Sequence, residues 1–276
     1  MRIDAHQHFW ALARGDYGWL TPDLGAIYRD FAPKDLVPLL GAARIDGTVL
    51  VQAAPTVAET EYLLSLAEQN AFIKGVVGWV DFEAADAPAQ ISALASNTSL
   101  VGLRPMIQDI TDPLWVLDEN LTPAFEAVQQ HDLTFDALTL PRHLGPLRQR
   151  LERQPDLRVV IDHGSKPLIK DAILGDWSDN MAALARETGA WCKLSGLVTE
   201  ASADWTNEDL RPYVDLLLDA FGPSRLIWGS DWPVCTLASS YERWCETTDT
   251  LLSHLSSMER QAIMGGNAAR AYNLRD

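Results

Sequence analysis

The stretch RIDAHQHFW at the start of the chain places two histidines, His6 and His8, at alternating positions behind Asp4. In a β-strand, residues two apart point to the same side, so both imidazoles would project together at a strand end. Paired imidazoles are typical of metal sites and of acid–base sites. The alternative is a pair of polar residues on a solvated strand end. The other candidate functional residues of the chain distinguish between a functional site and this alternative.

Two later stretches, VVIDHG and WGSDWP, each carry an ionisable residue at the end of an apolar run. His163 leaves the first run just before a glycine, which predicts an imidazole at the rim of a sheet. Asp231 lies between two tryptophans, where desolvation raises the pKa of a carboxylate and a neighbouring cation or metal ion lowers it. In both cases such a group can accept a proton from water.

Two cations occupy comparable positions, Arg104 in GLRP and Lys193 in KLSGL. They either balance nearby carboxylates or donate hydrogen bonds to a substrate carbonyl, ring oxygen or carboxylate. Ser195 is a weak candidate for a nucleophile because KLSGL is not the GxSxG elbow. The chain also has ten tryptophans. Aromatic rings stack on sugar-like rings, and Trp19 and Trp232 are the candidates for that role, while at least half of the tryptophans are expected to fill the core.

Eight short apolar runs predict the strands that position these residues. They span residues 2–9, 47–54, 73–82, 100–107, 133–140, 157–164, 191–198 and 225–233. Helical patterns lie in most of the gaps, at 58–70, 181–189, 207–222, 240–255 and 258–274, the last interrupted by a Gly-Gly pair. Eight strands alternating with helices predict a (β/α)₈ TIM barrel, with residues 1–276 as one domain. A doubly wound open sheet is the alternative, but the first strand lacks a Gly-rich nucleotide loop.

The C-terminal ends of the strands carry the chemistry in such a barrel. Polar residues stand at or near these ends: His6, His8, Gln52, Asp81, Arg104, Asp136, Asp162, His163, Lys193, Ser195, Ser230 and Asp231. The strand interiors are instead Val, Ile, Leu and Ala. This convergence favours an enzyme over a module that only binds. His131, His143 and His254 fall outside the set and are expected at the surface or at helix ends.

Composition disfavours several kinds of partner. The chain has 38 acidic and 22 basic residues, a formal net charge of −16, which repels nucleic acid and anionic lipid. No run approaches the ~20 apolar residues of a membrane helix. The N-terminus lacks a basic-then-apolar signal segment, so we expect a cytoplasmic protein, and a homo-oligomer is compatible with the sequence. Cys192, Cys235 and Cys245 form no CxxC pair and are expected to be small buried hydrophobes.

The motifs DAHQHFW, DYGWL, GLRP, VIDHGSKP, KLSGL, WGSDWP and GGNAARAY, in that order, resemble the amidohydrolase superfamily. More narrowly they resemble its branch of sugar lactonases, which includes L-fuconolactonase and L-rhamnonolactonase, over nearly the whole chain. The resemblance implies a distorted (β/α)₈ barrel of the amidohydrolase type and hydrolysis of a lactone ring.

The family's functional positions have counterparts here. His6 and His8 match its HxH pair, His163 its strand-end histidine and Asp231 its strand-eight aspartate. In metal-containing members these four positions hold a divalent ion, usually zinc. Arg104 stands where the fuller two-metal pattern has a bridging lysine, so the resemblance implies at most one ion. Catalysis without metal is the alternative, since some relatives work without it.

Together these residues suggest hydrolysis of an aldonolactone, most closely L-fucono- or L-rhamnono-lactone, by base-assisted attack of water on the lactone carbonyl. Asp231 is the expected general base, and the histidines either bind zinc or polarise the carbonyl. The expected catalytic residues are Asp231, His163, Arg104 and Lys193, the expected substrate-binding residues are Trp19, Gln52, Arg104, Lys193 and Trp232, and the expected metal ligands are His6, His8, His163 and Asp231.

Three alternatives stay open. Hydrolysis of a carboxylated lactone such as 2-pyrone-4,6-dicarboxylate needs several cations in one pocket, and only Arg104 and Lys193 are expected at the rim, with Arg142 as a third candidate. A metal-dependent decarboxylase on the same barrel ranks below it. The intact histidine and aspartate set disfavours a barrel that binds a sugar acid without turning it over.

Overall fold

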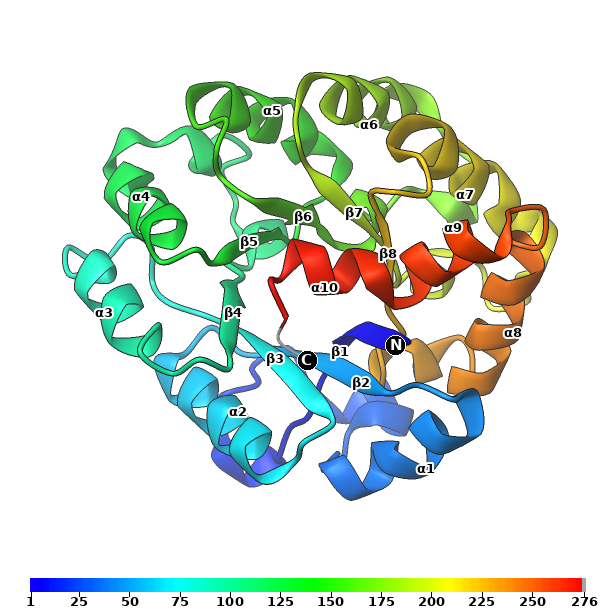
Figure 1. Ribbon diagram of the computed structural model, residues 1–276, viewed down its shortest axis with the longest axis horizontal. Coiled ribbons are helices and arrows are strands. Elements are labelled where there is room, and N and C mark those ends of the chain that lie inside the picture. The colour runs from blue at the N-terminus through cyan, green and yellow to red at the C-terminus, as the bar shows by residue number, and fades with distance from the viewer. Residues whose placement is uncertain (275–276) are drawn as a thin grey trace.

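Eight parallel strands follow one another around a barrel in the computed structural model, which describes residues 1–274 (Figure 1). They are β1 (Ile3–Gln7), β2 (Gly47–Val51), β3 (Ile73–Gly78), β4 (Leu100–Leu103), β5 (Thr134–Ala137), β6 (Val159–Ile161), β7 (Trp191–Leu194) and β8 (Leu226–Trp228). Each lies within the run predicted for it, so the (β/α)₈ barrel is confirmed. The barrel is distorted, because the register shifts within the pairs β1–β2, β2–β3 and β3–β4.

Helices enclose the strands on the outside (Figure 1). They are α1 (Pro33–Ala43), α2 (Val57–Gln69), α3 (Ala87–Leu94), α4 (Thr122–Gln130), α5 (Leu144–Arg153), α6 (Gly175–Glu187), α7 (Asn207–Phe221) and α8 (Tyr241–Leu251). Side-chain caps define several starts. Thr56 Oγ1 accepts from Glu59 N at 3.1 Å before α2, and Ser240 Oγ accepts from Arg243 N at 3.0 Å before α8. Each cap satisfies a backbone donor that the helix itself leaves without a partner.

The C-terminal segment closes one mouth of the barrel. It consists of α9 (Ser257–Gln261), a π-helical turn (Ala262–Gly266) and α10 (Asn267–Ala271), and α10 crosses the centre of the ring in Figure 1. Ala268, Ala271 and Tyr272 pack against inward-facing residues of the strands. The Gly-Gly pair interrupts the helix as predicted. A Cβ at Gly265 would lie 2.3 Å from the Met1 carbonyl oxygen, so the chain passes too close there for any other residue.

The barrel closes between β1 and the segment after β8. Asp231 N donates to His6 O at 2.8 Å, and His8 N donates to Trp232 O at 2.7 Å. The residues that form these two bonds are among those predicted from the sequence to be functional. The seam of the barrel is therefore also the place where His6, His8 and Asp231 meet.

Long connections gather at the C-terminal ends of the strands. Residues 8–32, 104–121, 162–174 and 229–240 join strands to the following helices, whereas the opposite connections are as short as residues 44–46 and 188–190. In (β/α)₈ barrels the loops after the strands carry binding and catalysis, so the site is expected at this end.

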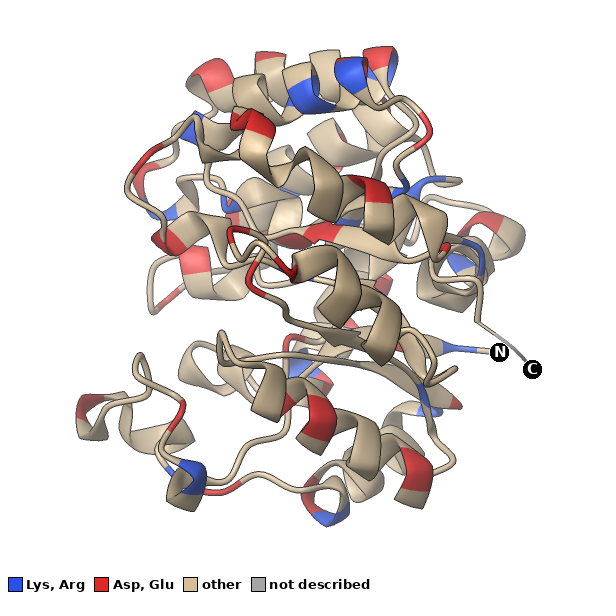
Figure 2. Cartoon of the chain, turned by 90° about the vertical axis from the view of Figure 1, so that its left-hand side faces the viewer, with Lys and Arg blue, Asp and Glu red and all other residues tan. Residues whose placement is uncertain are grey.

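Charge lies mostly outside this framework. Acidic residues are spread over the outer helices and loops (Figure 2). All three cysteines are buried, as expected. Among the described residues, none of the helices combines the length and apolar character that a membrane span requires.

Tyr272 ties the closing segment to the interior of the barrel. Its hydroxyl donates to Asp136 Oδ2 at 2.7 Å, and the side chains of both residues are buried. Tyr272→Phe removes this donor from a buried carboxylate, so we expect the free energy of unfolding to fall by about 1–3 kcal/mol in urea denaturation. Tyr62→Phe, at a half-buried position, is the control and should change it little. Equal losses in both variants would contradict the assigned role of the Tyr272 hydroxyl.

Candidate active site

A pocket of about 310 Å³ opens at the C-terminal ends of the strands. Its volume falls at the lower end of the range of small-molecule sites, about 300–1,000 Å³. His8, Trp19, Arg104, His163 and Asp231 line it, so it gathers five of the residues predicted from sequence. This pocket is the candidate active site.

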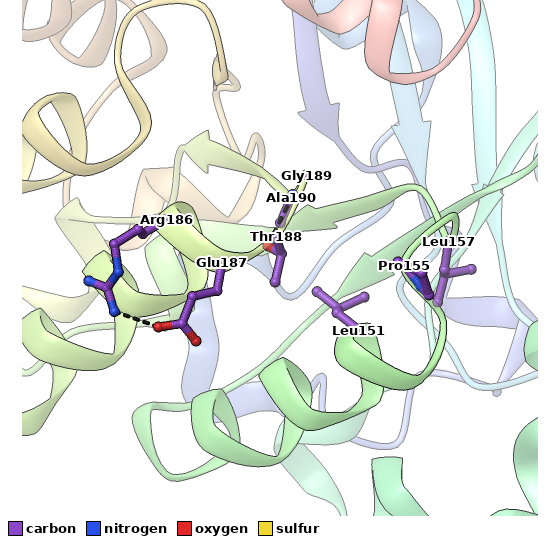
Figure 3. A pocket seen from close by; sticks show the side chains of 8 residues that line it. All are labelled: Leu151, Pro155, Leu157, Arg186, Glu187, Thr188, Gly189 and Ala190. Atoms are coloured by element: carbon purple, nitrogen blue, oxygen red, sulfur yellow. Dashed lines mark hydrogen bonds and ion pairs between the residues drawn. The ribbon is translucent and has the colours of Figure 1, made fainter.

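A second hollow, of about 190 Å³, lies beside α5 and α6 (Figure 3). Pro155 and Thr188 among its lining residues belong to connections that enter β6 and β7, at the ends of the strands away from the site. Its charged residues, Arg186 and Glu187, form an ion pair with each other, as Figure 3 shows. A surface ion pair beside apolar side chains provides neither an acid–base pair nor a ligand set.

Asp231 faces three imidazoles in the larger pocket. Its Oδ1 lies 3.3 Å from His8 Nε2, 3.8 Å from His6 Nε2 and 4.0 Å from His163 Nε2. All four side chains are buried, and His6 lies deepest, with no exposed surface. The structure therefore brings together the four predicted metal ligands.

Backbone strain accompanies this arrangement. His163 and Asp231 adopt φ values of 53° and 58°, in the left-handed region that a non-glycine residue enters at a cost of about 1–3 kcal/mol. The fold supplies compensating contacts. His163 Nδ1 is hydrogen-bonded to Ser195 Oγ at 2.9 Å, and the Asp231 amide is fixed to His6 across the barrel seam. These contacts orient both side chains.

Burial sets the protonation states. It lowers the pKa of His163 to about 4 because an imidazolium is poorly solvated there, and it lowers the pKa of His6 well below its ordinary value, helped by the charge of Lys193. Burial alone would raise the pKa of Asp231, but the neighbouring imidazoles outweigh it and hold that pKa below the usual range. At neutral pH the site thus combines neutral His6 and His163 with an ionised carboxylate.

The same donor set fits one divalent ion. Donor atoms of His6, His163 and Asp231 lie within 4.8 Å of one another, and neutral imidazole nitrogen and carboxylate oxygen are common zinc ligands. His8 Nδ1 lies 2.8 Å from Val51 O, an atom that can only accept, so Nδ1 carries a proton and Nε2 is directed at Asp231. Such a second hydrogen bond is typical of a histidine that binds metal.

Arg104 reaches the pocket from the end of β4 and is held by its neighbours. Its Nη2 donates to Gln52 Oε1 at 2.8 Å and also to Gln52 O. Its Nη1 donates to Asp162 Oδ2 at 3.2 Å and lies 3.2 Å from His6 Nε2. Gln52, expected to bind substrate, is fully buried and instead supports the guanidinium.

Lys193 lies beneath the pocket rather than on its wall. It is fully buried, with Nζ 2.6 Å from Asp136 Oδ2, 2.9 Å from Asp162 Oδ1 and 3.1 Å from His6 Nδ1. The expected contact with substrate does not fit this placement. The residue points into the barrel from inside β7 and orients His6 and Asp162 from below.

The two tryptophans predicted at the substrate differ in placement. Trp19 lines the pocket, and its Nε1 donates to Ala53 O at 2.7 Å. Trp232 is only 3% exposed and packs edge-to-face on Phe9 and Phe31, with ring centroids 6.0 and 5.1 Å apart. Trp232 is therefore part of the core under the first loop, and its expected role as a substrate wall does not fit.

Two other residues considered in the sequence, Asp81 and His143, make local hydrogen bonds outside the pocket. Asp81 is exposed beyond the end of β3 and accepts from Glu83 N at 3.0 Å. His143 lies at the end of the helix α5, as expected, but it is buried, and its Nδ1 accepts from Leu140 N at 3.0 Å. Both side chains cap turns away from the pocket.

An ion pair in the pocket was missed by the sequence analysis. Lys166 Nζ lies 3.5 Å from Glu200 Oε1, and both residues line the pocket with His163 and Asp231. Burial raises the pKa of Glu200, and Lys166 opposes that shift. Lys166 lies three residues after His163 in VIDHGSKP, a signal that could have found it. Glu200 enters from the loop after β7 and has no comparable signal.

Apolar residues complete the pocket. Besides Trp19, six of them line it, from the loops after β1, β2, β4, β5 and β8: Leu24, Ala53, Met106, Leu138, Val234 and Leu237. The first and last loops meet here, because the short helical segments Pro22–Ile27 and Val234–Leu237 pack together. The pocket thus offers an apolar surface beside its charged groups, which suits a ligand with both polar and apolar parts.

The chain is similar to known proteins in sequence and in structure. The family model for amidohydrolases matches residues 3–274. An L-fucono-1,5-lactonase of Burkholderia ambifaria is 46% identical over 99% of this chain and 96% of its own length. An L-fucono-1,5-lactonase of Burkholderia multivorans is 39% identical over the same shares. A crystal structure of an amidohydrolase from Burkholderia multivorans with bound zinc superposes with a TM-score of 0.94 at 38% identity, covering 100% of both chains.

The His163 ring depends on the glycine packed against it. Gly196 has φ 62°, and a Cβ there would lie 2.5 Å from His163 Nδ1. Gly196→Ala adds both strain and overlap, so we expect the free energy of unfolding to fall by about 2 kcal/mol or more. Gly145→Ala is the control, since nothing lies within 4 Å of its Cβ position in α5, and should raise stability by about 0.5–1 kcal/mol. Similar changes in both variants would refute the contact.

Proposed function

The chain belongs to the amidohydrolase family, and on that premise we propose that it is a lactonase, hydrolysing the ring ester of a neutral sugar lactone of the L-fucono-1,5-lactone type. The observation that carries the proposal is the ionised carboxylate of Asp231, placed in an open pocket among neutral imidazoles and beside Arg104. This is the combination that ester hydrolysis by water requires: a proton acceptor and donors for the oxyanion.

The proposed reaction uses these residues in order. Asp231 accepts a proton from a water molecule, whose oxygen attacks the lactone carbonyl carbon. Arg104 stabilises the negative charge that develops on the carbonyl oxygen. When the ring C–O bond breaks, the ring oxygen takes up the proton that Asp231 accepted from water and becomes a hydroxyl group, and the product is the open hydroxy acid. His8 Nε2 and His163 Nε2 lie near the carboxylate, 3.3 and 4.0 Å from Asp231 Oδ1.

One divalent ion is proposed for the same site, held by His6, His8, His163 and Asp231. When bound, zinc would supply Lewis-acid polarisation of a carbonyl or of water. The related zinc-bound structure and the ligand set described above support this assignment.

The charges of the pocket favour a neutral substrate. Its lining includes three carboxylates, Asp109, Glu200 and Asp231, against two cations, Arg104 and Lys166. Both cations are already paired, Arg104 with Asp162 and Lys166 with Glu200. A lactone with two carboxylates would meet no free cation among these residues, whereas sugar hydroxyls can bond to Lys166 and Glu200.

Asp231→Asn tests the proposed base. The amide retains the shape but cannot accept a proton, so we expect kcat to fall about 10²–10⁴-fold with L-fucono-1,5-lactone. Acid release followed with a pH indicator measures it. Asp23→Asn removes an exposed carboxylate near the mouth and serves as the control, with kcat expected within twofold of the parent (roughly the scatter of surface substitutions). Near-full activity of Asp231→Asn across pH would eliminate this assignment.

Substrate class is tested by a direct comparison. Because the pocket carries more carboxylates than cations, kcat/KM should be higher for L-fucono-1,5-lactone than for 2-pyrone-4,6-dicarboxylate at the same pH. Lowering the ionic strength should widen the gap, since less screening strengthens the repulsion between charges. A preference for the dicarboxylate would replace the proposed substrate with the carboxylated lactone.

A further inference from the structure

His6 Nε2 has two potential partners, and they compete for one lone pair. The nitrogen lies 3.2 Å from Arg104 Nη1 and 3.8 Å from Asp231 Oδ1. The first contact is a hydrogen bond with a permanent cation, and the second marks the direction in which a shared ion would be bound. Only one of them can use the lone pair at a time.

Three groups lie near the two ring nitrogens of His6. A guanidinium only donates, so the contact of Arg104 with Nε2 requires the tautomer whose proton is on Nδ1. Nδ1 lies 3.4 Å from Asp162 Oδ1, an atom that can accept a proton, and 3.1 Å from Lys193 Nζ, which is also paired with Asp136 and Asp162. Zinc binding through Nε2 requires this same tautomer, in which the one lone pair of neutral His6 is the pair that faces Arg104.

Arg104 is not free to leave without loss. Its other donors are engaged by Gln52 and Asp162, and the residue is 3% exposed. A guanidinium is a permanent cation in proteins. A fixed positive charge beside the ligand atom opposes a divalent cation by simple Coulomb repulsion.

We propose that Arg104 and a divalent cation such as zinc compete for His6 Nε2, so that Arg104 weakens the binding of the ion at this site. With Arg104 in place, the guanidinium provides a positive charge beside the substrate carbonyl. With the ion in place, Arg104 has to move off His6 Nε2. The inference rests on the ligand set named under the proposed function, but it concerns ion affinity and not turnover.

The test is zinc binding to protein stripped of metal, measured by competition with a chromophoric chelator in the absence of substrate. Arg104→Met removes the competing donor and its charge, so we expect one zinc per chain bound about tenfold or more tightly than in the parent. Arg104→Gln does the same with a polar side chain that can still bond to Gln52, and it carries the test if the methionine variant does not fold.

Arg142→Met is the matched control. Arg142 is exposed after β5 at the same end of the barrel, so its loss changes the net charge equally without freeing His6. Zinc affinity should stay within about twofold of the parent, a change near 0.4 kcal/mol. Equal or weaker affinity in a folded Arg104 variant overturns the proposal, and so does an equal gain in the Arg142 variant.

A crystal of the parent protein soaked in zinc tests the competition without any substitution. We expect the ion on His6 Nε2 and the Arg104 guanidinium moved out of hydrogen-bond distance from it. An ion bound to His6 with Arg104 still bonded to the same nitrogen would overturn the proposal. Because neither readout uses a lactone, an inactive protein would refute the proposed function and leave this inference standing.

Discussion

Two backbone hydrogen bonds close the barrel, from Asp231 N to His6 O and from His8 N to Trp232 O. A parallel barrel must pair its last strand with its first, and here that pairing uses the chemical residues themselves. The side chains of Asp231 and His8 thereby face each other at 3.3 Å. Gly229 lets the segments approach, since a Cβ there would lie 2.7 Å from His6 Cβ. The site exists because the fold closes at this seam.

Beneath the seam, charges are buried in pairs. Lys193 lies between Asp136 and Asp162, and Arg104 bonds to Asp162 from the pocket side. An unpaired charge at this depth would cost several kcal/mol, so each cation requires its carboxylate. Lys193 and Arg104, together with His6, outweigh burial and keep the pKa of Asp162 well below its usual range. The Asp162 carboxylate in turn lies 3.4 Å from His6 Nδ1, so this buried network packs against the ring from beneath the pocket.

The sequence predicted the structure correctly wherever a pattern of residue types is compatible with one kind of structure. Apolar β-branched runs predicted all eight strands because parallel strands buried on both faces must be apolar. The alternation of His6 and His8 likewise predicted their meeting. The depth of a side chain below the pocket was not predictable. Lys193 and Trp232 stand near strand ends, yet Lys193 lies below the pocket and Trp232, after the left-handed Asp231, packs in the core under the first loop. Glu200 was missed because only the folded loop brings it to the pocket.

The most direct test of the account is a crystal structure with the lactam analogue of L-fucono-1,5-lactone, which replaces the ring oxygen with N–H and resists hydrolysis. We predict that the ring lies in the pocket with its carbonyl oxygen within hydrogen-bond distance of Arg104 and its carbonyl carbon facing Asp231, with room for one water molecule between them. A lactam bound with its carbonyl directed away from Asp231, or bound outside this pocket, would contradict the account.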